Sequence, residues 1–138
     1  MKENELTEAI IGSAIEIHRA FGPGLIECIY EDALAMELGF RGIGYERQKP
    51  VPLNYKGHPL GAHLKLDLQV EGRVIVELKS VERLLPVHEA QLLTYLRLTS
   101  VQVGLLINFN VSRLATGVKR RVNNFQDSAP RRLRGVSS

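Results

Sequence analysis

Apolar and polar residues alternate along two neighbouring segments in the middle of the chain. In the first segment the apolar positions are Leu64, Leu66, Leu68 and Val70, separated by Lys65, Asp67 and Gln69. In the second they are Val74, Val76 and Leu78, alternating with Ile75, Glu77 and Lys79. A period of two is typical of a half-buried strand, so residues 64–80 are predicted to form two strands joined by a turn.

The two apolar rows predict the register of this hairpin. Residues directly opposite each other in an antiparallel pair point to the same face, so the rows share a face only when Val70 lies opposite Val74. This register places Asp67 opposite Glu77 and requires a three-residue connection at 71–73. A two-residue turn would split the apolar rows between the two faces.

The turn leaves an alternative open, because Gly72 does not occupy the position that a simple bulged turn prefers. A bulge elsewhere in the hairpin therefore stays open. In either case the hydrophobic pattern alone groups Asp67, Glu77 and Lys79 on one face of the sheet.

Three helices are predicted around the hairpin. Residues 5–20 carry apolar side chains at steps of three and four, namely Leu6, Ile10, Ala14, Ile17 and Phe21, and the helix should stop at Gly22-Pro23-Gly24. A second helix is predicted from about Leu25 to Leu38, with Gly39 as its stop. Its expected buried side consists of Ile26, Ile29, Ala33 and Met36, with Leu34 as a further candidate. Pro86 can open a third helix that ends near Leu98.

The remaining segments are predicted to be extended. Residues 45–55 contain Pro50 and Pro52, which suit an edge strand or a loop better than a central strand. Residues 101–110 have the continuous apolar middle of a fully buried strand. Strand, helix and strand in that order favour a parallel crossover, and so an α/β fold with a mixed sheet covered on both faces. Residues 111–122 are expected to add a short strand or helix.

Composition and charge are consistent with one compact domain. The chain has 138 residues, 44% of them hydrophobic, which suits a single domain over residues 1–122 followed by a basic, flexible tail at 123–138. Residues 119–138 hold six basic side chains and one acidic one, a net charge of +5, which leaves −2 for the rest. Such a basic end can help to attract a polyanion.

The cysteine count and the hydropathy indicate the cellular compartment of the protein. The single Cys28 excludes an internal disulfide and a thiolate metal cluster. No apolar run is long enough to cross a bilayer, and the polar start MKENELTE is unlike a signal peptide. We therefore expect a cytoplasmic protein with no membrane contact.

The acids of the hairpin are suited to metal-dependent phosphodiester cleavage. Asp67 and Glu77 are hard oxygen ligands of the kind that Mg²⁺ or Mn²⁺ prefers, and the backbone carbonyl of Leu78 can add another. Lys79 can orient or deprotonate the attacking water and offset phosphate charge. The other interpretation is that Asp67, Glu77 and Lys79 are only the solvated face of an amphipathic hairpin with a cross-strand ion pair. Charged side chains on a protein surface usually have no special function.

Two pairs on the predicted helices are further candidates. His88, Gln91 and Tyr95 share a stripe of the third helix, and Gln91 and Tyr95 can contact substrate phosphate or a lysine. Glu27 and Tyr30 form a similar pair at the start of the second helix, with Glu27 as a candidate third acid and Tyr30, like His88, as a candidate substrate contact. Each pair also has an ordinary structural explanation, a half-buried helix face for the first and a favourable charge near a helix N-terminus for Glu27.

Together these motifs resemble the GxxExxY family of the PD-(D/E)xK nuclease superfamily. The matching positions are Gly24, Glu27 and Tyr30 (GLIECIY), Asp67 followed by Glu77 and Lys79, and Gln91 with Tyr95 (QLLTY). The resemblance covers roughly residues 6–122. One position departs from the pattern, because Leu66 stands where the superfamily name has proline.

The resemblance implies a restriction-endonuclease-like core in which a central mixed sheet is flanked by helices. It also implies roles for the residues: Asp67, Glu77 and Lys79 match the catalytic positions, Glu27 the helical acid, and Gln91 with Tyr95 the QxxxY helix of RecB-type nucleases. The function implied is a Mg²⁺- or Mn²⁺-dependent nuclease that acts on nucleic acid, with DNA favoured over RNA and a homodimer left open. The alternative is a non-catalytic module of the same fold that binds nucleic acid or protein.

Other candidate residues fit the patterns of metal, nucleophile and phosphate sites less well. His18, His58 and His63 have no spacing that forms a zinc site, and Cys28 has no base nearby in the sequence. The stretch Gly22-Pro23-Gly24 lacks the lysine and the length of a phosphate-binding loop. The arginines at 131–134 can bind nucleic acid nonspecifically or form a solvated tail.

Overall fold

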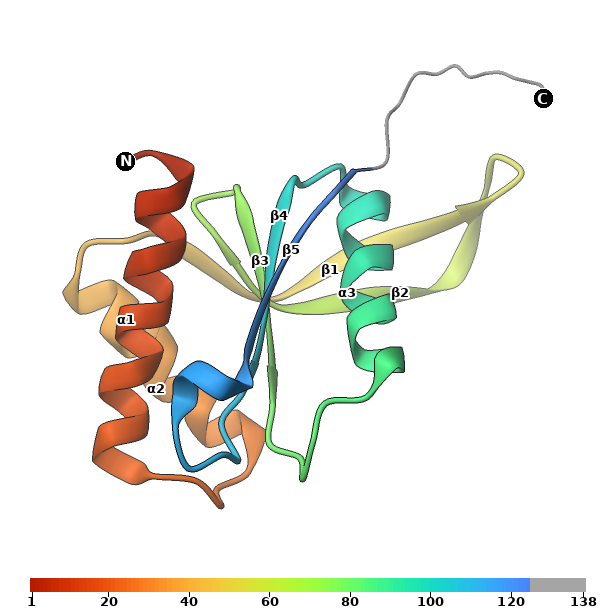
Figure 1. Cartoon of the computed structure of the whole chain (residues 1–138). Coiled ribbons are helices and arrows are strands. Elements are labelled where there is room, and N and C mark those ends of the chain that lie inside the picture. Colours follow the sequence, from red (N-terminus) through yellow and green to blue (C-terminus); the bar gives the residue numbers. More distant parts are fainter. Residues whose placement is uncertain (125–138) are drawn as a thin grey trace.

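A mixed five-stranded sheet in the order β1-β2-β3-β4-β5 forms the centre of the molecule in the computed structural model, which describes residues 1–124 (Figure 1). β3 pairs antiparallel with β2 and parallel with β4, and the outer pairs β1–β2 and β4–β5 are antiparallel. Along the chain the elements are α1 (Glu3–Phe21), α2 (Glu27–Phe40), β1 (Tyr45–Tyr55), β2 (His58–Val70), β3 (Val74–Lys79), α3 (Pro86–Thr99), β4 (Val103–Asn108), the 3₁₀ turn η1 (Leu114–Gly117) and β5 (Val118–Val122).

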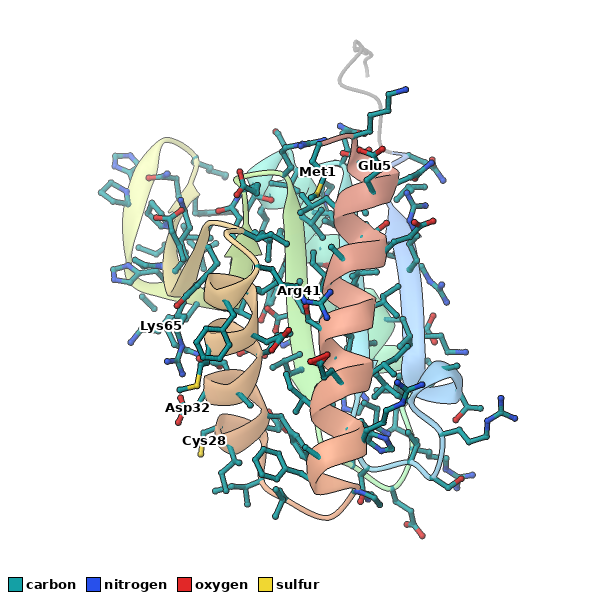
Figure 2. All side chains as sticks on the ribbon, turned by 90° about the vertical axis from the view of Figure 1, so that its left-hand side faces the viewer. Met1, Glu5, Cys28, Asp32, Arg41 and Lys65 are labelled. Carbon is teal, nitrogen blue, oxygen red and sulfur yellow. The ribbon has the colours of Figure 1, made fainter. Side chains whose placement is uncertain are left out.

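The helices cover the two faces of the sheet unequally. α1 and α2 lie side by side on one face, over a core that includes Leu68, Val76 and Leu105 (Figures 1 and 2). α3 covers the other face through Leu92 and Leu96. The α/β architecture expected from the sequence, a mixed sheet flanked by helices, is therefore confirmed, as is the parallel crossover from β3 through α3 to β4.

The register predicted for the central hairpin is correct. Val70 lies opposite Val74, and the three-residue connection is 71–73. Glu71 and Gly72 both have positive φ, 53° and 65°, and the N–H of Arg73 donates to the carbonyl of Val70 at 2.9 Å. Glu71 is held in this unusual conformation by Gly44, because the N–H of Glu71 donates to the Gly44 carbonyl at 2.9 Å.

The apolar row of β2 does not stay on one face, which corrects the sequence interpretation. Leu68 and Val70 pack beneath α1 and α2, whereas Leu66 packs beneath α3 and Leu64 lies against the same cluster. The alternation breaks at Asp67. Simple alternation holds only along a regular strand, and the structure shows that β2 is irregular at this residue.

The buried side predicted for α2 is wrong at three positions and correct at Leu34. Ile26 and Met36 are 63% and 60% exposed, and Ile29 is exposed as well, while the buried apolar residues are Tyr30, Leu34, Ala35 and Leu38. The helix carries two apolar stripes. Tyr30 decides between them, because its ring stacks on Phe109 at a centroid distance of 4.3 Å. The helix also continues past Gly39 to Phe40.

The flanking elements follow the predictions more closely. β1 is an edge strand that pairs only with β2, as its prolines indicate, and α3 begins at Pro86. Residues 111–122 contain both a short helical turn and a strand. No helix within residues 1–124 is long and apolar enough to span a bilayer. Most of the predicted tail lies outside the described residues, so its flexibility stays a prediction.

The contact between α3 and β4 gives a test of the packing. A Cβ at Gly104 would stand 2.7 Å from Cδ1 of Leu92, whose side chain is fully buried. We expect Gly104→Ala to lower the free energy of unfolding by roughly 1–3 kcal/mol in urea titrations. The matched control is Gly61→Ala, where a Cβ meets nothing within 4 Å and the change should stay within about 0.5 kcal/mol. Equal stabilities of the two variants would show that α3 packs less closely on β4.

Candidate active site

The candidate site lies where β2 separates from β3. The regular pairing of the two strands extends from Val70 opposite Val74 to Leu68 opposite Val76. At the next position the backbones are joined through side chains. The N–H of Asp67 donates to Oε2 of Glu77 at 2.9 Å, and the N–H of Leu78 donates to Oδ2 of Asp67 at 2.8 Å. These two crossed hydrogen bonds hold both carboxylates in the gap between the strands.

The irregularity of β2 has a counterpart on β1. The pairs Arg47–Leu68 and Lys49–Leu66 place Gln48 across from Asp67. Gln48 has φ 48°, a left-handed conformation that is rare for a residue other than glycine. Strain of this kind persists only where the surroundings enforce it, and it is common at functional sites.

Glu31 on α2 holds Gln48 in place. The amide of Gln48 donates to Oε1 of Glu31 at 2.8 Å and more weakly to Oδ1 of Asp67 at 3.4 Å. Glu31 is buried, and its other oxygen accepts from Nε of Arg47 at 3.0 Å. Arg47 also pairs with Asp32 on the same helix. α2 is thereby connected to the carboxylates of the sheet through a continuous polar network.

The electrostatics of the site favour protonation of its acids. Burial, and after it the neighbouring Asp67 carboxylate, raises the pKa of Glu77 to about 8. Burial also raises the pKa of Asp67, against the hydrogen bond from the Leu78 N–H. Two buried carboxylates that share a gap repel each other, so one of them holds a proton at neutral pH unless a cation is near.

Lys79 is the nearest cation on the same strand. It follows Glu77 by two residues and is half-buried, and it lowers the pKa of both Asp67 and Glu77. Among residues 1–124 it forms no ion pair within 4 Å. The ammonium group therefore offsets the carboxylate charge only in part.

The donor set of this gap suits a hard divalent cation. Glu77 is only 5% exposed, and within residues 1–124 its carboxylate accepts one hydrogen bond, at Oε2. The N–H and C=O of one strand residue point to the same side, so the Leu78 carbonyl faces the gap as its N–H does. Two carboxylates and a carbonyl are oxygen ligands. No group of three or more His, Cys, Asp or Glu side chains in the described part of the chain is arranged to hold a metal.

α3 contributes Tyr95 to the site, and the other two predicted residues of this helix have different surroundings. Tyr95 is 8% exposed, and burial together with the Glu77 and Asp67 carboxylates raises the pKa of its phenol. Gln91 is exposed on the same helix. His88 caps the helix, because its Nδ1 accepts the N–H of Leu85 at 2.9 Å.

The two residues predicted at the start of α2 lie in different environments. Glu27 is exposed, lines an open pocket of about 600 Å³ with Ser80 and Asn110, and adds to the negative field at Asp67. Tyr30 is fully buried, and its hydroxyl donates to the carbonyl of Gly22 at 2.6 Å. The structure therefore places Glu27 near enough to Asp67 to affect the pKa of its carboxyl, and Tyr30 under the loop that precedes α2.

Sequence reasoning missed Glu31 and Gln48. Glu31 was detectable, because it follows Glu27 by four residues and so lies on the same side of the helix. Gln48 was not, because its role depends on a positive φ that no residue pattern signals.

One of the comparisons with known proteins identifies a family. A family model described as the PD-(D/E)XK nuclease superfamily matches residues 4–121. A search of the curated proteins gives no match. One similar solved structure is described as "Crystal structure of SSO0001"; it is 18% identical, with 90% of this chain and 81% of that chain covered and a TM-score of 0.44. That likeness is too low to carry an argument.

The pKa of Glu77 predicts how stability depends on pH in the absence of divalent cations. Between the unfolded pKa of about 4.5 and the folded value of about 8, the folded protein keeps a proton that the unfolded chain releases. Stability should therefore fall as the pH rises through this window. Glu77→Gln keeps the hydrogen-bond acceptor but does not titrate. We expect it to be more stable than the parent protein at about pH 9, by roughly 3 kcal/mol, and to lose this advantage near about pH 5.

Urea unfolding with a chelator at several pH values measures this difference. The matched control is Glu82→Gln, an exposed glutamate in the loop after β3. Parallel pH curves for the Glu77 variant and the parent would contradict the raised pKa.

Proposed function

We propose, from the premise that the chain belongs to the PD-(D/E)XK nuclease superfamily, that it hydrolyses phosphodiester bonds of nucleic acid with the help of a divalent cation. The mixed sheet flanked by helices is consistent with the restriction-endonuclease-like fold of this superfamily. Its nucleases generally use divalent metals, and their substrates are nucleic acids. The active site that we propose is the gap between β2 and β3.

The observation that carries this proposal is the pair of crossed hydrogen bonds between Asp67, Glu77 and Leu78. They hold two carboxylates in the gap beside the Leu78 carbonyl, where Lys79 compensates the charge only in part. Asp67, Glu77 and the Leu78 carbonyl would hold Mg²⁺ or Mn²⁺. When bound, such an ion polarises a phosphate and lowers the pKa of a water ligand.

The other residues of the site would act on the substrate and on the attacking water. Lys79 would orient the water and stabilise negative charge on the scissile phosphate. The Tyr95 phenol is a neutral hydrogen-bond donor at physiological pH, and the raised pKa keeps it so beside the acids, where it can donate to a phosphate oxygen. Glu77, which holds a proton in the metal-free protein, would release it as the cation binds.

The outer residues have supporting roles in this proposal. Glu27 would be a third acid at the edge of the open pocket, and Gln91 and His88 would contact the substrate from the exposed side of α3. Tyr30 fits an indirect role better than the direct substrate contact expected from the sequence, because its hydroxyl holds the loop at Gly22 in place. Glu31 would position Gln48 and, through it, Asp67.

Several finer assignments rest on the sequence resemblance and on composition. Gly24, Glu27 and Tyr30 support membership of the GxxExxY family within the superfamily. DNA is favoured over RNA as the substrate. A cytoplasmic location and a homodimer stay predictions, which fractionation and the molecular mass in solution would test.

A non-catalytic binding module is the second candidate. It is favoured by one observation, namely that each acid already accepts a backbone N–H, so Asp67 and Glu77 stabilise the junction of β2 and β3 even without a reaction. In that case the protein would retain nucleic acid without turnover, and metal would not change the binding.

Substitutions at the site distinguish these candidates. We expect Mg²⁺- or Mn²⁺-dependent cleavage of nucleic acid that falls at least about 100-fold in Lys79→Ala and in Glu77→Gln, because charge stabilisation and ligand charge are lost. Thermal unfolding should show that both variants fold. Cleavage is measured on labelled single- and double-stranded DNA and RNA.

Lys2→Ala removes an exposed lysine at the start of the chain and should leave cleavage unchanged. Full activity of both site variants would exclude this mechanism. Absence of cleavage on every substrate with either metal, combined with tight binding, would favour the non-catalytic module.

A further inference from the structure

β1 and β2 form a ribbon that projects beyond the rest of the sheet (Figure 1). β2 pairs with β3 only through Leu68, Gln69 and Val70, so the part of β2 before Asp67 has β1 as its strand partner. Residues 54–63 are all exposed, including the tip residue Tyr55 at 63%. A two-stranded ribbon that is solvated on both faces buries little apolar area and contributes little to the core.

The ribbon is basic, whereas the helices on one face of the sheet are acidic. Residues 49–65 include three lysines and no aspartate or glutamate. α1 and α2 carry a single arginine, Arg19, against eight acids: Glu3, Glu5, Glu8, Glu16, Glu27, Glu31, Asp32 and Glu37. A polyanion is therefore repelled by the α1–α2 face and attracted to the ribbon.

Two of the three lysines are available for an outside partner. Lys49 is paired with Glu46 at 2.7 Å. Lys56 lies at the tip, 5.4 Å from the centroid of the Tyr55 ring. Lys65 stands at the base of the ribbon, two residues before Asp67, and extends into solvent (Figure 2). Lys56 and Lys65 therefore place positive charge at the tip and at the base of the ribbon.

The shape of the ribbon fits one class of partner. The major groove of B-form DNA admits a two-stranded β-ribbon, whereas the major groove of A-form RNA is too deep and narrow for side-chain contacts. His58 to Asp67 spans roughly 30 Å of strand, or about nine base pairs of duplex. The free edge of β1 carries Pro50 and Pro52, which disfavour the addition of a strand from a protein partner.

We infer that the β1–β2 ribbon is a duplex-DNA-binding arm in which Lys56 contacts the substrate about one helical turn from the carboxylates and Lys65 contacts it close to them. This inference rests on the proposed nuclease function, because it names the substrate class of the same site. It adds a binding surface that none of the catalytic residues forms. The continuity of β2 from the arm into Asp67 fixes the distance between the duplex contact and the site.

The test is a binding measurement with a chelator present, so that cleavage plays no part. Fluorescence anisotropy with a labelled DNA duplex of about 30 base pairs is recorded over a salt series. We expect Lys56→Ala/Lys65→Ala to weaken binding about tenfold and to reduce the slope of log affinity against log salt by up to about 1.8, since two phosphate contacts are lost. Both lysines are exposed, so the variant should unfold at the same temperature as the parent.

The matched control is Lys2→Glu, which changes the net charge by the same two units at the start of α1. It should bind the duplex like the parent protein. Equal losses in the control and the arm variant, or no loss in either, would overturn the inference. So would equally tight, arm-dependent binding of double-stranded RNA, or an arm variant that changes the molecular mass in solution instead of the affinity.

The binding measurement distinguishes a failure of the arm assignment from a failure of the catalytic proposal. If the arm is assigned correctly but the catalytic proposal fails, the arm-dependent binding persists without cleavage. If the catalytic proposal is correct but the arm is not, cleavage persists and the lysine variant binds and cleaves like the parent.

Discussion

The crossed hydrogen bonds between Asp67, Glu77 and Leu78 are the interaction on which the rest of the site depends. They replace a regular backbone pair by two bonds from backbone N–H groups to carboxylates, so each strand keeps its donor satisfied while the strands separate. The separation places the buried Glu77 next to the half-buried Asp67. Burial and proximity then raise their pKa values, which makes the gap receptive to a proton or a divalent cation.

The surrounding fold supports this junction from several directions. Gln48 adopts a left-handed backbone conformation across from Asp67 and is held there by the buried Glu31 of α2. Tyr95 approaches from α3, on the other side of the sheet. The same junction is where β2 leaves the body of the sheet and becomes the exposed ribbon. The arm and the acids therefore share one strand, so a ligand held by one is positioned relative to the other.

The central hairpin shows how far residue patterns can predict this fold. The register from Val70 opposite Val74 followed from the need to bury one apolar row, and it is correct. The same rule failed for Leu66, because simple alternation assumes a regular strand and Asp67 interrupts it. α2 failed for a different reason. Both of its apolar stripes fit the helical period of the sequence equally well. Only the stacking of Tyr30 on Phe109 selects the stripe that is buried, and these two residues are far apart in the chain.

The sequence by itself determined the order of the elements, the edge position of β1, the start of α3 and the grouping of Asp67 with Glu77, because these depend on local propensity and on a two-residue period. Only the tertiary structure decided that Glu31 and Gln48 belong to the same network and that Tyr30 lies beneath a loop. Those facts depend on side chains that meet across different elements. A positive φ and a stacked ring pair are outcomes of packing, and no local pattern encodes them.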